Sequence, residues 1–258
     1  MENKIALVTG ATSGIGWSTA IALGRLGYAI IGTGRRSEKL DALGQELAKE
    51  NILFFSLTFD VRDQNAVSKA IESLPEKWKD IDVLVNNAGN AHGFDPIQTG
   101  TIADWEAMLD INVKGLLYVS KAVIPTMLSK KSGTIVNIGS IAGKEVYPNG
   151  NVYCASKHAV DALTKGMRMD LNPHNIRVIG VHPGLVETEF SLVRFKGDAE
   201  RSRKVYEGFQ PLTPEDIADT IAFAVSRPAH VVLADIVMLP TAQASSTIVT
   251  KNLNHESN

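Results

Sequence analysis

The sequence predicts an α/β fold in which helices cover both faces of a seven-stranded parallel sheet. Short runs rich in β-branched residues alternate with longer stretches of helical pattern along the 258 residues. Several of these runs are apolar almost throughout, which is typical of strands buried on both faces. The alternation implies right-handed crossovers and a doubly wound sheet, and such sheets bind ligands beyond the carboxyl ends of their strands.

The predicted elements follow one another along the whole chain. The strand candidates are residues 5–9, 28–33, 52–58, 81–86, 133–138, 176–181 and 234–239. Two helix starts are recognisable between them. Thr101 followed by Asp104 resembles a capping box, and Thr213 is followed by Pro214, a residue suited to the first helical position.

Composition favours one globular domain over residues 1–258. Hydrophobic residues make up 44% and charged residues 21% of the chain, and no stretch reads as a linker. The formal net charge of −2 gives no basic footprint, so nucleic acid is not an expected partner. Six histidines without metal-ligand spacing and a single cysteine, Cys154, predict no metal site.

The N-terminal sequence, the absence of a long apolar run and the cysteine content favour a cytoplasmic protein. The N-terminal residues lead directly into the first predicted strand, without the segments of a signal peptide. No run reaches the roughly 20 apolar residues that cross a bilayer, so no membrane partner is expected. Cys154 is the only cysteine and cannot form an internal disulfide, which agrees with a reducing compartment.

A glycine-rich turn follows the first predicted strand and precedes a helical pattern. Glycine allows a tight turn and lets backbone amides approach a pyrophosphate, which also lies in the positive field of the helix N-terminus. An ordinary glycine-rich loop is the alternative, but the strand before it and the helix after it favour a dinucleotide-binding turn. The turn contains Gly10, Thr12, Ser13, Gly14, Ile15 and Gly16.

The end of the second predicted strand bears on which dinucleotide binds. An acidic residue there would accept hydrogen bonds from a ribose 2′-hydroxyl and would repel a 2′-phosphate. The chain has Arg35 and Arg36 instead. Two guanidinium groups can bind a 2′-phosphate through charge-assisted hydrogen bonds, so the expected cofactor is NADP rather than NAD. A solvated arginine pair at the start of the next helix is the alternative.

Four residues form a candidate catalytic set. Tyr153 and Lys157 are four residues apart in a helical stretch and share one face. Ser140 lies just beyond the fifth predicted strand, and Asn112 lies in the helical stretch after the fourth. A free tyrosine has a pKa of about 10, and an ammonium about 5 Å away would lower that pKa by about 2 units, into a range that suits a base.

In order and spacing, these residues resemble a short-chain dehydrogenase/reductase over essentially the whole chain. The resemblance implies a Rossmann fold and a homotetramer. It also implies that Tyr153 is the acid/base, that Ser140 orients the substrate oxygen, that Lys157 binds the nicotinamide ribose, and that Asn112 holds a water on the proton path. The other cofactor contacts that it implies are Asp60 and Val61 at the adenine, Asn87 beside a ribose with the adjoining Ala88 and Gly89, and Pro183, Gly184, Val186 and Thr188 along the nicotinamide.

The region after Pro183, a substrate flap at about 184–212, bears on the substrate. Residues 193–198 and 212–216 resemble the NADP-dependent 3-hydroxy acid dehydrogenases, which oxidise small molecules like serine and allo-threonine. A hydroxy acid needs a partner for its carboxylate, and Arg194 is the predicted one. Lys196 is the other candidate, and two solvated loop charges are the alternative to both.

Three other functions stay open. A broad-range NADPH-dependent ketone or aldehyde reductase would use the same four residues with a more apolar pocket. A 3-oxoacyl carrier-protein reductase would usually end its last strand on Asp-Gly-Gly, where this chain has Leu239, Pro240 and Thr241. A non-catalytic NADP-sensing protein would be expected to lack Tyr153 or Lys157.

Overall fold

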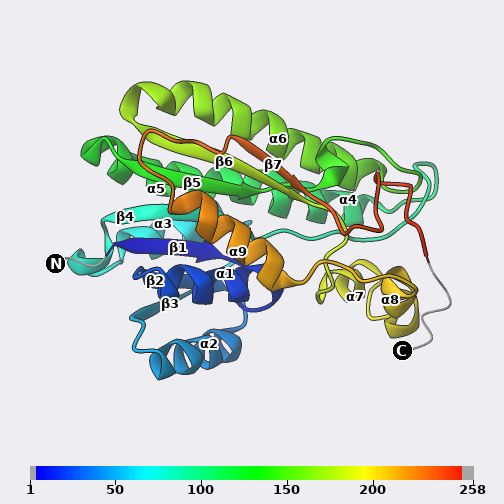
Figure 1. The fold of residues 1–258 in the computed structure, drawn as a ribbon, viewed down its shortest axis with the longest axis horizontal. Helices are drawn as coiled ribbons and strands as arrows, with labels where there is room; N and C mark the ends of the chain where they lie inside the picture. The colour runs from blue at the N-terminus through cyan, green and yellow to red at the C-terminus, as the bar shows by residue number, and fades with distance from the viewer. Residues whose placement is uncertain (1–3, 252–258) are drawn as a thin grey trace.

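The computed structural model describes residues 4–251. Seven parallel strands form one sheet in the order β3-β2-β1-β4-β5-β6-β7 (Figure 1). The chain builds outward from β1 to β3, returns to place β4 on the other side of β1, and then builds outward to β7. This is the doubly wound Rossmann arrangement expected from the sequence, with its switch point between β1 and β4.

All seven predicted strands are present, and the bounds of three of them are those predicted. β6 runs two residues further than expected because its end pairs with β7, where Pro183 lies opposite Met238. β3, at the edge of the sheet, begins two residues later than expected. The strands are β1 (Ile5–Thr9), β2 (Ala29–Gly34), β3 (Phe54–Thr58), β4 (Ile81–Asn86), β5 (Gly133–Ile138), β6 (Ile176–Pro183) and β7 (Asp235–Met238).

Helices cover both faces of the sheet and bury a separate hydrophobic core on each. On β1, Ile5 and Leu7 face the core formed with α3, α5 and α6, whereas Ala6 and Val8 face the core formed with α1, α2 and α9. Figure 1 shows α5 and α6 on one side of the sheet and α1 and α9 on the other. The helices are α1 (Gly14–Arg25), α2 (Ser37–Lys49), α3 (Gln64–Glu72), α4 (Ile102–Leu109), α5 (Leu116–Lys130), α6 (Asn151–Leu171), α7 (Phe190–Arg194), α8 (Ala199–Tyr206) and α9 (Pro214–Val225).

The two predicted helix starts differ in detail. The Thr213 hydroxyl accepts from the Asp216 N–H, the Asp216 carboxylate accepts from the Thr213 N–H, and the capping box of α9 is complete. At α4 the Thr101 hydroxyl accepts from the Asp104 N–H. The return bond is not found among the described residues, because the Asp104 carboxylate turns instead to the Lys196 ammonium, 2.9 Å away.

Two short segments bring further groups to the carboxyl ends of the strands. A π-helical turn, Asp110–Gly115, joins α4 to α5 and carries Asn112. Such turns occur frequently at functional sites. Beyond β6, α7 and α8 lie within the predicted flap and project from one end of the sheet (Figure 1). Within residues 4–251, no helix has both the length and the apolar character needed to cross a membrane.

Candidate active site

A cleft of about 380 Å³ opens where β1 to β6 end, within the range of volumes typical of small-molecule sites. Most of the residues singled out from the sequence form its walls, although they come from segments far apart in the chain. Three predicted site residues lie outside this lining but contact residues within it: Gly16, Asn112 and Arg194. They contact Gly10, Asn90 and Tyr153, respectively. The predicted residues that line the cleft are Gly10, Thr12, Ser13, Gly14, Ile15, Arg35, Arg36, Asp60, Val61, Asn87, Ala88, Gly89, Ser140, Tyr153, Lys157, Pro183, Gly184, Val186 and Thr188.

The glycine turn after β1 has the shape that a phosphate-binding turn requires. Gly10 and Gly14 have φ values of 66° and 52°, a conformation that residues with a Cβ rarely adopt. A Cβ on Gly16 would overlap the carbonyl oxygen of Gly10 and Nδ2 of Asn87. The three glycines therefore bring the N-terminus of α1, with its free N–H groups and positive dipole end, to the wall of the cleft.

The segment after β4 is fastened to the end of β1. The N–H groups of Asn87 and Ala88 donate to the Thr9 hydroxyl at 2.9 and 3.0 Å. The Asn87 side chain donates to the Thr9 carbonyl at 2.9 Å. These bonds hold the two central strands together at the switch point of the sheet, where a dinucleotide would cross it.

The two arginines after β2 both line the cleft but differ in their contacts. Nη2 of Arg36 donates to the hydroxyls of Thr12 and Ser13, at 3.1 and 2.9 Å, and lies 3.0 Å from a carboxylate oxygen of Glu189 in the flap. The Arg35 side chain is 60% exposed, and its nearest acidic partner, Asp60, is 3.9 Å away. Arg36 thus bridges the phosphate turn and the flap, while Arg35 leaves its guanidinium accessible.

Asp60 lines the cleft and pairs with two arginines, Arg62 at 2.6 Å and Arg35 at 3.9 Å. Burial by itself raises the pKa of the Asp60 carboxyl, but the Arg62 guanidinium, 2.6 Å away, holds that pKa below its usual range. The carboxylate is therefore ionised at neutral pH and can accept hydrogen bonds at its end of the cleft.

Tyr153 and Lys157 project from one face of α6 into the cleft, as predicted. Both are buried, and the Lys157 ammonium lies 6.0 Å from the centre of the Tyr153 ring. The ammonium donates to the carbonyl of Ile138 at the end of β5, 2.9 Å away. Ser140, two residues further on, donates its hydroxyl to the Pro183 carbonyl at 3.4 Å and so joins β5 to β6.

The electrostatics of the pair differ from the sequence-based expectation. Burial raises the pKa of Tyr153, and the Ser140 hydroxyl and the Arg194 guanidinium only partly oppose it. Burial also lowers the pKa of Lys157 to about 8. The structure does not show the expected fall in the pKa of Tyr153, because the loss of water around the phenolate outweighs the groups that stabilise it.

Asn112 supports the site from behind. Its side chain accepts from the N–H of Asn90 and donates to the Asn90 carbonyl, both at 2.8 Å, and donates to the Ser156 hydroxyl at 3.0 Å. A Cβ on Gly89 would lie 2.9 Å from Oδ1 of Asn112 and 3.6 Å from the Lys157 ammonium. Asn112 therefore holds the strand-end segment against Lys157, and both protons of its amide are engaged in doing so.

Of the two flap cations considered as partners for a carboxylate, Arg194 lies beside Tyr153, whereas Lys196 pairs with Asp104. The Arg194 guanidinium stacks over the rings of Phe94, Tyr147 and Tyr153, with its carbon 4.6, 5.5 and 5.6 Å from their centres. It donates to the Tyr147 hydroxyl at 3.0 Å, and its buried Nε has no partner among residues 4–251. Lys196 instead pairs with Asp104 on α4.

Several lining residues were missed by the sequence reasoning. Phe59, Asn90, Glu189, Phe190 and Val193 carry no local signal of their own, because each reaches the cleft through the packing of its segment. Glu189 and Phe190 could have been suspected from their place in the predicted flap. The Phe190 ring, 5.6 Å from the ring of Tyr153, narrows the cleft next to the phenol.

Comparison with known protein families places the chain among oxidoreductases. The family described as short chain dehydrogenase matches residues 4–198. An NADP-dependent 3-hydroxy acid dehydrogenase of Salmonella typhi is 47% identical over 241 residues, which cover 93% of this chain and 96% of that protein. A serine 3-dehydrogenase of Agrobacterium fabrum is 41% identical over 238 residues, with 92% and 94% covered.

Solved structures extend the similarity to three dimensions. The closed form of a serine dehydrogenase complexed with NADP⁺ matches with a TM-score of 0.90 and 42% identity, covering 95% of this chain and 98% of that one.

Proposed function

The chain belongs to the short-chain dehydrogenase family, and we propose that this oxidoreductase moves a hydride between NADP and the hydroxyl-bearing carbon of a small 3-hydroxy acid such as serine or allo-threonine. The observation that carries the substrate class is the position of Arg194. Its half-buried guanidinium carbon lies 5.6 Å from the centre of the Tyr153 ring, which supports the proposal that Arg194 binds the substrate carboxylate while the 3-hydroxyl meets the phenol.

NADP fits the residues at the other end of the cleft. In the turn from Gly10 to Gly16, the positive φ values of Gly10 and Gly14 and the lack of space for a Cβ at Gly16 suit a close approach of backbone amides to a pyrophosphate. The accessible guanidinium of Arg35 and the Arg36 side chain, next to Ser13, provide the charge and donors for a 2′-phosphate. Of the relatives named above, the Salmonella typhi dehydrogenase is NADP-dependent by name, and the closed serine dehydrogenase was solved with NADP⁺. Asp60 and Val61 would then meet the adenine, and Asn87 with its neighbours a ribose.

In the oxidation direction, Oη of Tyr153 takes the proton from the substrate hydroxyl while the carbinol carbon gives up its hydride. Bound NADP⁺ would supply the hydride acceptor, and the product would be a carbonyl compound: an aldehyde from serine, a ketone from allo-threonine. Ser140 holds the substrate oxygen by its hydroxyl, and the segment from Pro183 to Thr188 shapes the nicotinamide end of the cleft. In reduction the phenol returns the same proton.

The proton transfer needs cations near the phenol because burial favours its neutral form. Among residues 4–251, Lys157, at 6.0 Å, and Arg194, at 5.6 Å, are the cations that lie over the Tyr153 ring. We assign to Lys157 the further task of binding the nicotinamide ribose. Asn112 keeps the 87–90 segment in place, and we assign to it the further role of holding a water on the proton path.

The proposal is tested by an NADP-coupled assay over L-serine, D-serine, allo-threonine, 3-hydroxybutyrate and a few neutral alcohols and ketones. We expect oxidation of at least one hydroxy acid with a kcat/KM above that of every neutral alcohol. A preference for neutral ketones and alcohols would overturn the substrate class in favour of a broad-range reductase. Absence of NADP-linked turnover on the whole panel would overturn the catalytic proposal.

Three further expectations belong to this proposal. The chain is expected to act as one domain, to work in the cytoplasm and to assemble as a homotetramer. A single calorimetric transition, cell fractionation and light scattering of the purified protein test them in turn.

A further inference from the structure

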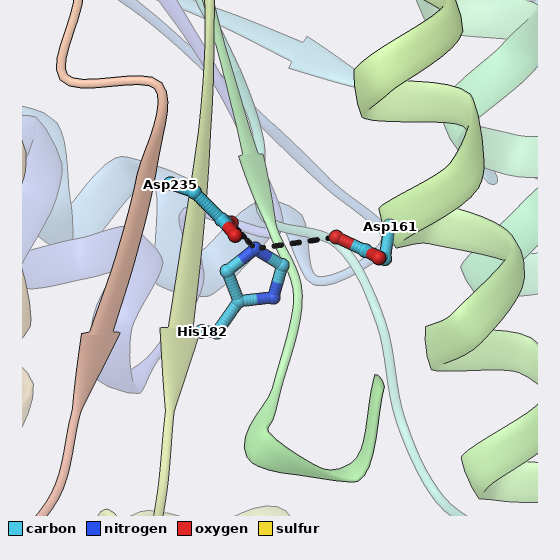
Figure 2. A group of neighbouring side chains, drawn as sticks. All are labelled: Asp161, His182 and Asp235. Atoms are coloured by element: carbon cyan, nitrogen blue, oxygen red, sulfur yellow. Dashed lines mark ion pairs between the residues drawn. The ribbon is translucent and has the colours of Figure 1, made fainter. Parts of the chain in front are cut away.

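His182 is a fully buried histidine immediately before Pro183 in β6, and it lies outside the groups used above. Its Nε2 is 2.5 Å from Oδ1 of Asp235 on β7 and 3.8 Å from Oδ1 of Asp161 on α6 (Figure 2). Despite this short contact, neither ring nitrogen of His182 makes a hydrogen bond of normal geometry within residues 4–251. Burial lowers the pKa of His182, so the ring is neutral at pH 7.

The cluster around His182 has the residue types of a metal site, but its charges are already balanced. Nζ of Lys144 lies 2.7 Å from a carboxylate oxygen of Asp161 and 2.7 Å from one of Asp235. Nζ of Lys165 is 2.7 Å from the other oxygen of Asp161. Two ammonium groups thus neutralise two carboxylates, and Lys144 takes the place between them that a divalent cation would need.

The ring of His182 packs directly against the segment that carries Ser140. The Gly139 N–H donates to the carbonyl of Val181 at 2.7 Å, and the Ser140 hydroxyl donates to the carbonyl of Pro183 at 3.4 Å. His182 lies between these two acceptors, and a Cβ on Gly139 would overlap its Nδ1. The backbone on both sides of His182 and its own ring therefore hold Gly139 and Ser140 together.

The same cluster holds the other end of that segment. Lys144 follows Ser140 by four residues, after the turn Ile141–Gly143, and its ammonium is bound by the two carboxylates that flank His182. Asp161 is also one helical turn beyond Lys157 on α6. The segment from Gly139 to Lys144 is thus fastened at its start by the imidazole and at its end by the ion pairs.

We propose that His182 is a positioning residue that acts through Ser140 and sets the place of its hydroxyl relative to Tyr153. The proposal rests on the role of Ser140 in the proposed function. Removing the ring would leave a void behind Gly139, which has no side chain to fill it, and the Ser140 hydroxyl would lose its fixed position. A displacement of about 1 Å in such a group can cost about 100-fold in rate.

A double-mutant cycle between the two residues tests this idea. The four proteins are the parent, His182→Ala, Ser140→Ala and the double variant, assayed with NADP and the panel substrate that the parent turns over fastest. We expect His182→Ala to lower kcat about 10- to 100-fold in the parent, but by less than about threefold when Ser140 is already alanine. The dissociation constant for NADP, measured by fluorescence titration, should change by less than about threefold.

Val178→Ala is the matched control, because Val178 is equally buried in the same strand and does not contact Gly139. Val178→Ala should lower the melting temperature, and it should change kcat by the same factor in the parent and in the Ser140→Ala variant. Lys144→Met, a partly exposed position at the other end of the segment, should couple to Ser140→Ala as His182→Ala does, and it keeps the cycle measurable if His182→Ala fails to fold.

The outcomes separate the two proposals. Losses that multiply in the double variant, or an unchanged kcat in His182→Ala, would overturn the positioning role of His182 and leave the proposed function intact. A Ser140→Ala variant with the turnover of the parent would overturn the role of Ser140 and the positioning role together.

Discussion

Arg194→Met is expected to lower kcat/KM for the preferred hydroxy acid by about 10- to 150-fold. Loss of a charge-assisted hydrogen bond to a carboxylate corresponds to about 1.5–3 kcal/mol, which gives this range. Methionine keeps much of the apolar stem and can still pack on the rings of Phe94 and Tyr147. The cation–π contacts and the bond to the Tyr147 hydroxyl are lost whatever the substrate, so they cancel when an acid is compared with a neutral ketone.

The assay compares the acid with a neutral ketone on the parent, on Arg194→Met and on Lys196→Met. Lys196 lies in the same flap and pairs with Asp104, so its removal disturbs the flap without touching Tyr153. We expect the acid-to-ketone ratio of kcat/KM to fall in Arg194→Met and to stay within about threefold of the parent in Lys196→Met.

Two results would contradict the reasoning. An equal loss on the acid and the ketone in Arg194→Met would mean that Arg194 supports the flap and does not bind the carboxylate. A larger fall in the ratio for Lys196→Met than for Arg194→Met would mean that the flap adopts another arrangement during turnover.

Three further predictions concern the catalytic pair and the cofactor. Tyr153→Phe keeps the shape of the cleft and removes the ionisable proton, so kcat should fall by about 10²- to 10⁴-fold with little change in NADP binding, and turnover within threefold of the parent would contradict the assignment. Replacing Arg35 and Arg36 with neutral residues should weaken NADP binding by about 2–4 kcal/mol in a titration and leave NAD binding nearly unchanged; a parent protein that prefers NAD would refute it. Burial lowers the pKa of Lys157 to about 8, so the ammonium is present below that pH and is lost as the pH rises through it. The pH profile of kcat/KM should therefore decline on the alkaline side near pH 8. The Lys157→Arg variant keeps its side chain protonated, so its kcat/KM should decline only at higher pH, even if the plateau value is lower. A decline at the same pH in both proteins would exclude Lys157 as the titrating group.

The sequence by itself determined the class of fold and most of the cofactor end of the cleft. Strands buried on both faces need continuous apolar runs, so β1, β4 and β5 could be bounded to the residue. The positive φ values of Gly10 and Gly14 are local requirements, and glycine meets them wherever the rest of the chain lies. The i,i+4 spacing of Tyr153 and Lys157 is likewise a property of one helix.

Tertiary structure decided the features that depend on how segments far apart in the chain pack together and on which side chains are buried away from water. The sequence left Arg194 and Lys196 as rival partners for a carboxylate, and only the packing of the flap stacks one on Tyr153 and pairs the other with Asp104. The rise in the Tyr153 pKa and the fall in that of Lys157 come from burial, a quantity that no local pattern encodes. The contact of His182 with Gly139 was likewise decided by tertiary structure. It joins β6 to the end of β5, and the distance between two strands along the chain does not tell whether they are neighbours in the sheet.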